Sequence, residues 1–200
     1  VFISQTIPEN RKIIKELLEK LPFNYREKKD GFEILNKQLW SYLKQFGNKY
    51  QKYIPNEIKE LQSNNLKILI DWLFLGDGCI HKGQRNYHTT SERLANDFQE
   101  VLQKIGKYGI IRKRKQNNTE IKGRKINSIG YIWEVAEKNR EFHSLCSSKE
   151  NYISKINYSG NVYCCETDAG IIYVRRNGKP YWSGNSLLGE EVDLLIIDEA

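Results

Sequence analysis

Two stretches of the sequence carry the same order of predicted elements, and this repeat limits the fold more than any other feature. In the first stretch, a strand at Val1–Ile3 leads into an amphipathic helix, and a hairpin turn at Asp30-Gly31 leads to a second helix. In the second stretch, strand residues around Tyr87 lead through Thr89–Ser91 into a helix, and further strands and a helix follow. An internal repeat of this kind predicts one module with a pseudo-two-fold axis.

Sequence signals predict where the long helices begin. Thr6 and Glu9 have the spacing of a capping box, so we expect the first helix to start between them. We expect Asn64 or Asn65 to cap a later helix that runs through Leu75 and stops at a Gly-Asp-Gly turn. The first stretch has no counterpart of this later helix, and a true repeat would place one just upstream of the chain.

Composition changes twice toward the C-terminal end. A helix is expected over Asn139–Cys146, and the chain then becomes rich in Tyr, Val and Ile, with Asn177-Gly178 as the turn of a β-hairpin. After Asn185 an acidic stretch precedes the apolar run Leu194–Ile197. The predicted fold is therefore α+β, with residues 1–48 and 49–150 as two halves of one module, 151–185 as a small β piece, and 186–200 as the start of a separate domain.

The net charge of +7 is concentrated in one part of the chain. Between Ile111 and Lys125, seven basic side chains are accompanied by one acidic side chain, Glu120. A nucleic-acid partner explains such a local stripe better than general solubility does. A solvated basic hairpin is the alternative reading of the same residues.

The composition also excludes several classes of protein. The four cysteines form no Cys-x-x-Cys pair and the sequence has no His cluster at zinc spacing, so neither a zinc ribbon nor a disulfide framework is expected. The longest apolar run, Ile68–Leu75, is interrupted by Asp71 and is too short to span a bilayer. We therefore expect a protein of the reducing cytoplasm with no membrane partner.

The segment Leu69–Gly78 reads Leu-Ile-Asp-Trp-Leu-Phe-Leu-Gly-Asp-Gly and resembles the second LAGLIDADG motif of homing endonucleases carried by inteins. Upstream, Lys52–Pro55 resembles the Lys-x-Ile-Pro block of that family, and downstream Thr89–Ser91 resembles the segment that follows the motif. The resemblance covers residues 1–150. It implies a saddle of two αββαββ halves in which the first motif helix is missing from this chain, a double-stranded DNA partner, and phosphodiester hydrolysis.

The same resemblance implies roles for individual residues. Asp77 would bind Mg²⁺ with the Gly76 carbonyl beside it, because oxygen ligands suit this hard cation and the bound metal can activate water. Lys52 and Lys125 match positions that the family places near the scissile phosphates. The side chains implied to contact DNA are Lys82, Arg85, Arg112, Lys113, Arg114, Lys115, Lys122, Arg124 and Lys125.

Two departures from the family pattern affect the expected activity. Trp72 stands where the motif usually has a glycine that lets the two motif helices approach closely. The partner carboxylate of the first half is also absent from this chain. Because one aspartate cannot form a two-carboxylate site, we expect this chain alone to be inactive as a nuclease.

The stretch Tyr158–Ser186 resembles the C-terminal end of inteins, which belongs to the Hint splicing domain. The Asn185 side-chain nitrogen can attack its own backbone carbonyl and break the bond to Ser186, whose hydroxyl accepts the upstream acyl group. Gly184 and Cys164 stand where the family usually has a histidine and an aspartate, so less general-acid help is expected here. Splicing needs no cofactor, but it requires the missing N-terminal part of the intein, with the first LAGLIDADG motif and the N-terminal splicing block.

The last residues resemble another family. Leu194–Glu199 is similar to the Walker B strand of P-loop ATPases, in which Asp198 would coordinate Mg²⁺ and Glu199 would orient the attacking water. The wider segment resembles large subunits of phage terminases. The sequence thus favours an intein fragment with DNA cleavage and protein splicing as its two activities. The alternatives are a free-standing LAGLIDADG endonuclease or maturase, and a terminase-type ATPase that carries this insertion.

Overall fold

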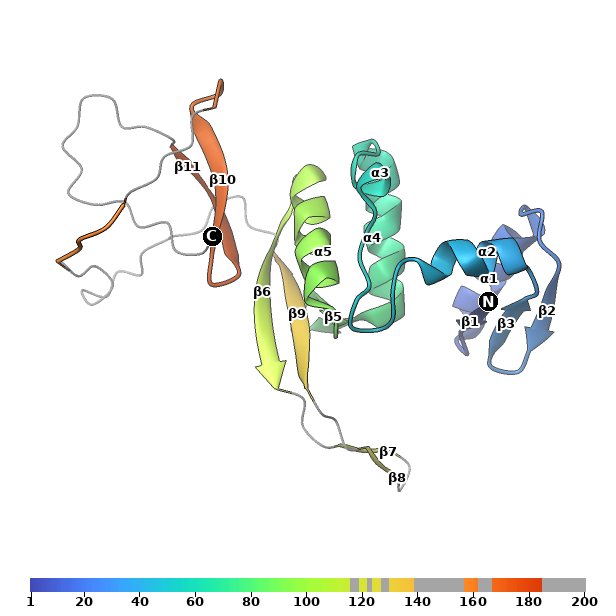
Figure 1. Cartoon of the computed structure of the whole chain (residues 1–200). Helices are drawn as coiled ribbons and strands as arrows, with labels where there is room; N and C mark the ends of the chain where they lie inside the picture. The colour runs from blue at the N-terminus through green and yellow to red at the C-terminus, as the bar shows by residue number, and fades with distance from the viewer. Residues whose placement is uncertain (116–118, 122–123, 127–129, 139–156, 162–166, 185–200) are drawn as a thin grey trace. The chain divides into compact units, whose positions relative to one another are not determined.

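The computed structural model describes residues 1–115, 119–121, 124–126, 130–138, 157–161 and 167–184, with backbone only for 119–121 and 124–126 (Figure 1). The chain divides into two compact units, Val1–Asn48 and Lys49–Ala200. Within the described ranges, none of the helices has the length and apolar character that a membrane span requires.

The first unit is a small three-stranded sheet with two helices. Its antiparallel strands lie in the order β1-β3-β2. The predicted hairpin is confirmed, but its turn is Lys29-Asp30, one residue earlier than predicted, and Gly31 is the first residue of β3. Leu18, Phe32 and Ile34 form its buried core. Its elements are β1 (Phe2–Ser4), α1 (Pro8–Glu19), β2 (Tyr25–Lys28), β3 (Gly31–Ile34) and α2 (Lys37–Lys44).

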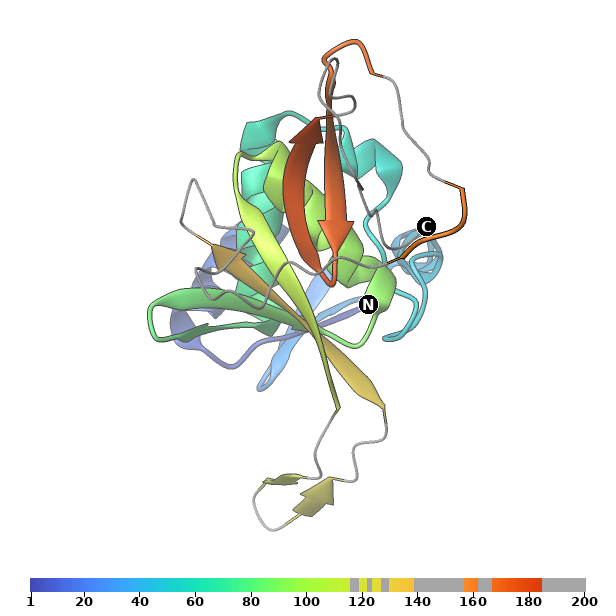
Figure 2. The same ribbon diagram turned by 90° about the vertical axis from the view of Figure 1, so that its left-hand side faces the viewer.

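The second unit contains a four-stranded antiparallel sheet in the order β4-β5-β9-β6, with α4 and α5 on one side (Figures 1 and 2). Tyr87 and Phe98 stack in its core with ring centroids 4.2 Å apart. Its elements up to the sheet's last strand are α3 (Asn56–Lys59), α4 (Ser63–Asp77), β4 (Gly78–His81), β5 (Gln84–Thr89), α5 (Glu92–Lys104), β6 (Tyr108–Lys115), β7 (Thr119–Ile121), β8 (Arg124–Ile126) and β9 (Tyr131–Lys138).

Strand order confirms the repeat that the sequence predicts. In both units a strand leads into a helix, and two later strands pair so that the last of them lies in the middle of the sheet. The order β1-β3-β2 corresponds to β5-β9-β6, with the small β7–β8 pair inserted between β6 and β9. Counted from each helix start, Ile14 and Leu18 of α1 match Phe98 and Leu102 of α5, and all four belong to or pack against a core. Among the described residues of the first unit, α4 and β4 have no counterparts.

The capping box predicted for α1 is wrong. The helix begins at Pro8, and Ile7 at its N-cap position makes no side-chain cap. The Gln5 amide oxygen instead accepts hydrogen bonds from the N–H groups of Thr6 and Ile7, at 3.1 and 3.0 Å. These bonds satisfy the donors ahead of the helix, so a Thr6 hydroxyl cap is not needed there.

The cap predicted for α4 is also wrong. The helix begins at Ser63, one residue after Gln62, so that Asn64 and Asn65 lie inside the first turn. The Asn65 N–H already bonds to the Gln62 carbonyl at 2.9 Å. Tertiary packing of this helix therefore extends it past the residues that local propensity favours as caps.

The basic region forms two separate pairings. The β6 strand pairs with β9 along its whole length, whereas β7 and β8 make their own two-stranded sheet beyond the end of that pair (Figure 2). The basic stretch between Ile111 and Lys125 is thus divided among β6, β7 and β8, and the helix predicted over Asn139–Cys146 lies outside the described residues.

The predicted C-terminal hairpin is confirmed. Strands β10 (Ile171–Arg176) and β11 (Lys179–Gly184) are antiparallel partners. Asn177 and Gly178 have φ values of 49° and 71°, the two positive values that a tight hairpin turn requires.

Candidate nucleic-acid interface

The LAGLIDADG-like segment ends in an exposed carboxylate. Helix α4 continues through Gly76 and Asp77, two residues beyond its predicted end, and β4 begins at once with Gly78. A side chain at Gly78 would bring its Cβ to 2.4 Å from the Phe74 carbonyl oxygen, so this abrupt change from helix to strand requires glycine. Burial raises the pKa of the Tyr87 hydroxyl, and the negative charge of Asp77 raises it further. The Asp77 carboxylate therefore lies close enough to this core residue to influence its ionisation.

Oxygen ligands at this helix end fit a hard divalent cation. Asp77 supplies a carboxylate, and Gly76 is among the last four residues of α4, whose carbonyls lack helical partners downstream unless a cap supplies one. The described residues contain no group of three or more His, Cys, Asp or Glu side chains that could hold a metal by themselves. Asp77 and the Gly76 carbonyl are thus oxygen donors of the kind that Mg²⁺ prefers.

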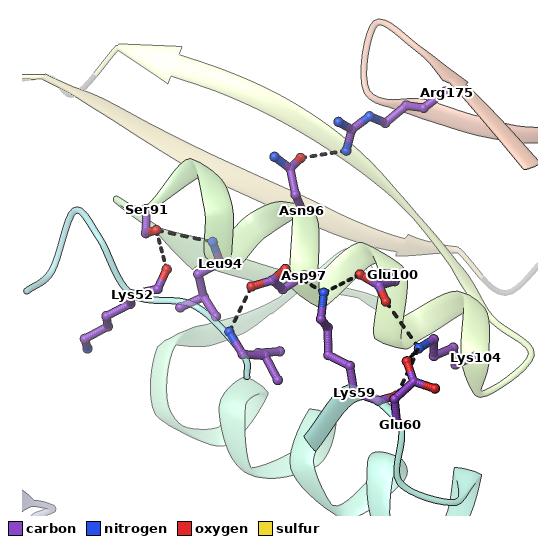
Figure 3. A network of polar contacts seen from close by, with 11 residues as sticks. Lys52, Lys59, Glu60, Ser91, Leu94, Asn96, Asp97, Glu100, Lys104 and Arg175 are labelled. Atoms are coloured by element: carbon purple, nitrogen blue, oxygen red, sulfur yellow. Dashed lines mark hydrogen bonds and ion pairs between the residues drawn. The ribbon is translucent and has the colours of Figure 1, made fainter. Parts of the chain in front are cut away.

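Three side chains, from the start and first turns of α5, hold the segment that carries Lys52, and Figure 3 shows two of them, Ser91 and Asp97. The Ser91 hydroxyl donates to the Lys52 carbonyl at 2.6 Å, and the Thr90 hydroxyl donates to the Lys49 carbonyl at 2.6 Å. The Asp97 carboxylate accepts the Ile54 N–H at 2.8 Å. The Lys52 backbone is thus anchored, while its side chain is exposed and points away from α5 (Figure 3).

An ion-pair network continues this anchorage toward α3 (Figure 3). Lys59 bonds to Glu100 at 2.7 Å and to Asp97 at 3.3 Å, and Lys104 bonds to Glu60 at 2.7 Å. Burial favours neutral Lys59 and neutral Glu100, but their hydrogen bonds outweigh it, so the pKa of Lys59 is raised and that of Glu100 is lowered. Hydrogen bonding to Glu60, and secondarily to Glu100, raises the pKa of Lys104.

The face of the sheet opposite the helices carries clustered cations. Side chains alternate along strands, so Arg112, Arg114, Glu134 and His88 share this face, whereas their buried neighbours pack toward α5. Arg114 and Arg112 bond to one Glu134 oxygen at 3.0 and 3.4 Å, and His88 lies 3.5 Å from the other oxygen. One carboxylate thereby orders two guanidinium groups that are each about half exposed.

Three other predicted DNA contacts lie away from the Arg112–Arg114 face. Lys113 lies over the rings of Tyr131 and Trp133, and strand alternation puts Lys115 on the same side, opposite Arg112 and Arg114. Lys82 occupies the β4–β5 turn with a φ of 50°.

Arg85 is the most strongly engaged of the predicted DNA contacts. Its guanidinium bonds to Asp71 at 2.9 Å, lies 3.6 Å from Glu137, and stacks over the Phe74 ring. These partners belong to α4 and to the sheet face that packs on it. Arg85 is therefore not brought together with Arg112 and Arg114.

Several predicted site residues fall outside the described parts. These are Lys122, Cys164, Asn185, Ser186, Asp198 and Glu199, together with the side chains of Arg124 and Lys125. Gly184 is described, as the exposed last residue of β11.

The residues that support this surface are two buried acids that the sequence patterns above do not single out. Glu134 is 6% exposed. The sequence offered a signal for it, because an acidic residue interrupts an apolar strand there. Asp97 is 7% exposed on an otherwise apolar helix face. A buried acid requires a partner, and in both cases the partner is a candidate DNA-binding or catalytic segment.

Residues 66–154 match the family model of a LAGLIDADG-like domain. The match begins within α4, includes Asp77 and the basic strand β6, and continues past β9. It supports a LAGLIDADG homing endonuclease, a family of DNA-cleaving enzymes that generally use divalent metal ions.

Proteins with three different names are similar to this chain. An ATP-dependent Clp protease proteolytic subunit of Chlamydomonas moewusii is 31% identical over 185 residues, which cover 90% of this chain and 18% of that protein. A DNA-directed RNA polymerase subunit beta C-terminal section of Stigeoclonium helveticum is 25% identical over an alignment that covers 92% of this chain and 21% of that protein. The replicative DNA helicase DnaB of Synechocystis is 35% identical over 75 residues, 34% of this chain and 9% of that protein. The chain thus spans about a fifth or less of each.

Proposed function

We propose that this chain is part of an intein that contains a Mg²⁺-dependent, site-specific DNA endonuclease and the C-terminal half of a protein-splicing site. The observation that carries the nuclease proposal is the exposed Asp77 at the end of α4, inside the segment that matches the LAGLIDADG-like domain. The arginines on the open sheet face and the anchored Lys52 segment support it.

The residues of this chain have separable roles in DNA cleavage. Asp77 and the Gly76 carbonyl would hold Mg²⁺, which activates water and stabilises the leaving oxygen of the phosphodiester. Lys52 lies on a segment fixed by Ser91, so that its ammonium can offset charge that develops on the scissile phosphate. Arg112 and Arg114, preoriented by Glu134, bind the duplex and fix its register.

The second carboxylate of the site would come from the counterpart of α4 in the other half. Support for this comes from the surface of α4, where Ile68 and Leu75 are 58% and 43% exposed and share a stripe with half-buried Trp72. A side chain at Gly76 would meet nothing within 4 Å, so this side of the helix end is open. An apolar stripe that ends at an acidic residue suits a second helix of the same kind.

The splicing proposal is supported by the C-terminal hairpin and by the relatives. β11 ends at Gly184, one residue before Asn185, so the cyclising asparagine would follow directly from an ordered strand. The Asn185 side-chain nitrogen would attack its own carbonyl carbon, the 185–186 peptide bond would break, and the amino group of Ser186 would leave with a proton. Segments similar to this chain occupy small fractions of proteins named as a protease subunit, a polymerase section and a helicase, as expected of an inserted element.

A free-standing LAGLIDADG endonuclease fits the nuclease part equally well, and a terminase-type ATPase that carries the insertion remains the other alternative. Mass spectrometry of the complete precursor distinguishes them. An intein releases its C-terminal flank by cleavage between Asn185 and Ser186, and Asn185→Ala stops the release. An intact, single-length product from the unmodified precursor would overturn the splicing proposal.

The nuclease proposal is tested with the complete protein and a plasmid library of randomised inserts in Mg²⁺. We expect one class of insert to be cut, and Asp77→Asn to abolish cutting while duplex binding persists. Asp71→Asn, a change to an exposed acid of the same helix, is the matched control and should leave cutting intact. Cutting by Asp77→Asn at the unmodified rate would refute the role of this carboxylate.

A further inference from the structure

A cleft of about 630 Å³ lies along the outer edge of β6, between α5 and the tip of the β10–β11 hairpin. Its lining includes the basic residues Arg112, Lys113, Arg114 and Arg175 and one acidic residue, Glu92. Three of these basic residues come from the region that matches the LAGLIDADG-like domain, and Arg175 comes from the hairpin. Strand alternation turns the side chains of Arg112 and Arg114 to the opposite face of the sheet, so Lys113 and Arg175 are the cations on the cleft's side. On the cleft's side, two cations therefore stand against one acid, Glu92.

The hairpin tip is built into the edge of the sheet. The Gly178 carbonyl accepts the Ile111 N–H at 2.9 Å and the Gln99 side-chain amide at 3.0 Å. A Cβ at Gly178 would lie 2.1 Å from the Ile111 carbonyl oxygen, so only glycine permits this approach. The contact occupies the outward backbone donor of an edge strand, which would otherwise be open to pairing.

Two of the cleft's cations are held by neutral groups. One terminal nitrogen of Arg175 donates to the amide oxygen of Asn96 at 2.6 Å (Figure 3) and to that of Gln99 at 3.1 Å. Lys113 lies 4.5 and 5.1 Å from the ring centroids of Tyr131 and Trp133. Amide oxygens and aromatic rings fix a cation in place without cancelling its charge, so both side chains retain their attraction for an anion.

The other repeat has a related cleft with a different source of charge. A cleft of about 490 Å³ in the first unit is lined by the α1 side chains Lys12 and Lys15. Counted from the helix starts, these two lysines correspond to Asn96 and Gln99 of α5, the residues that bind Arg175. Where α1 carries its own cations, α5 therefore carries amides that hold a cation supplied by the hairpin.

We propose that the cleft at the β6 edge binds a backbone phosphate of duplex DNA, and that Arg175 and Lys113 are its ligands. The inference rests on the proposed DNA-binding function, and it adds the C-terminal hairpin to the DNA interface. Among the described residues, the side-chain bonds of Arg175 use only Nη1, so its Nη2 and Nε groups can donate to phosphate oxygens. The strand β6 then contributes to DNA binding in two places. Its arginines Arg112 and Arg114 lie on the open face of the sheet, and its outer edge borders the phosphate site.

The test measures binding of a fluorescein-labelled, mixed-sequence DNA duplex to the full chain over a range of salt concentrations. One lost phosphate contact reduces the slope of log K against log salt by about 1. We expect this reduction for Arg175→Gln and no reduction for Lys179→Gln, which removes an equal charge from the other face of the same hairpin. Inorganic phosphate is added as a competitor. If the cleft binds free phosphate and not DNA, inorganic phosphate will saturate it at concentrations that leave duplex binding unchanged.

Two further variants separate phosphate binding from a purely structural latch. Arg175→Lys keeps the charge but cannot reproduce the forked bonds, and it should retain the slope if the charge contacts DNA. Gly178→Ala undocks the tip and should lose slope as Arg175→Gln does. Equal slopes for Arg175→Gln and Lys179→Gln would overturn the inference, as would loss of slope in Arg175→Lys. Failure of the unmodified chain to bind duplex would instead refute the proposed function itself.

Discussion

Ser91 offers the sharpest test of how the Lys52 segment is held. Its side chain is fully buried, donates to the Lys52 carbonyl at 2.6 Å, and accepts the Leu94 N–H at 3.2 Å as the N-cap of α5. Ser91→Ala removes both bonds. Loss of the N-cap costs about 1 kcal/mol, and loss of the donor to the Lys52 carbonyl costs about 1 kcal/mol more.

The combined loss of about 2 kcal/mol lowers the thermal midpoint by about 4–8 °C for a chain of this size. Circular dichroism during heating measures that midpoint, and hydrogen exchange at the Ile54 amide reports whether the segment itself has loosened. Ser63→Ala is the matched control, because its exposed hydroxyl also donates to a carbonyl, that of Lys104 at 3.2 Å, without a cap. We expect the control to change stability by less than about 0.5 kcal/mol.

Exchange at the Ile54 amide tests the local contact separately from global stability. In Ser91→Ala, exchange at Ile54 should accelerate by more than the change in global stability explains. A midpoint equal to that of Ser63→Ala, or unchanged protection of Ile54, would show that the hydroxyl does not hold this segment.

Three further predictions concern Glu100, Gly78 and Glu134. Hydrogen bonds from Lys59 and Lys104 outweigh burial and lower the pKa of Glu100 in the folded state. Its stabilising contribution is therefore present above its unfolded pKa of about 4.3 and is lost as pH falls through the folded value. In Glu100→Gln, the free energy of unfolding in urea should fall less steeply between pH 5 and pH 3, roughly the span that brackets that unfolded pKa. Gly78→Ala should lower stability by about 1–3 kcal/mol in urea unfolding, since its Cβ would meet the Phe74 carbonyl oxygen at 2.4 Å. Glu134→Gln removes the carboxylate shared by two arginines, so duplex affinity at low salt should rise while unfolding free energy falls by about 1.5–3 kcal/mol; unchanged affinity in a fluorescence titration would contradict the placement of those arginines at the DNA surface.

The order of elements could be predicted from the sequence because it depends on local patterns. Ile14 and Leu18, four positions apart, lie in or against one core, and Phe98 and Leu102, also four apart, lie in the other, as helical periodicity requires. The Asn177-Gly178 turn was equally readable, since few other residues accept two successive positive φ values. These features depend on periodicity and backbone sterics, which neighbouring residues determine.

Tertiary contacts decided the exact helix limits and the partners of charged side chains. Local cap signals at Thr6 and Asn64 lost to a Gln5 contact and to packing of α4. Basic residues that are consecutive in the sequence also diverge, with Arg112 on the open face and Lys113 over aromatic rings.

The hairpin's role was the least predictable part of the molecule. Arg175 is separated from Asn96 by 79 positions, and no periodicity in either segment indicates that they meet. A hydrogen bond of this kind depends on how the two segments approach after folding, whereas a helix or a tight turn depends on residues a few positions apart. The sequence alone therefore determined which local elements form, and the tertiary structure alone decided which charges face one another.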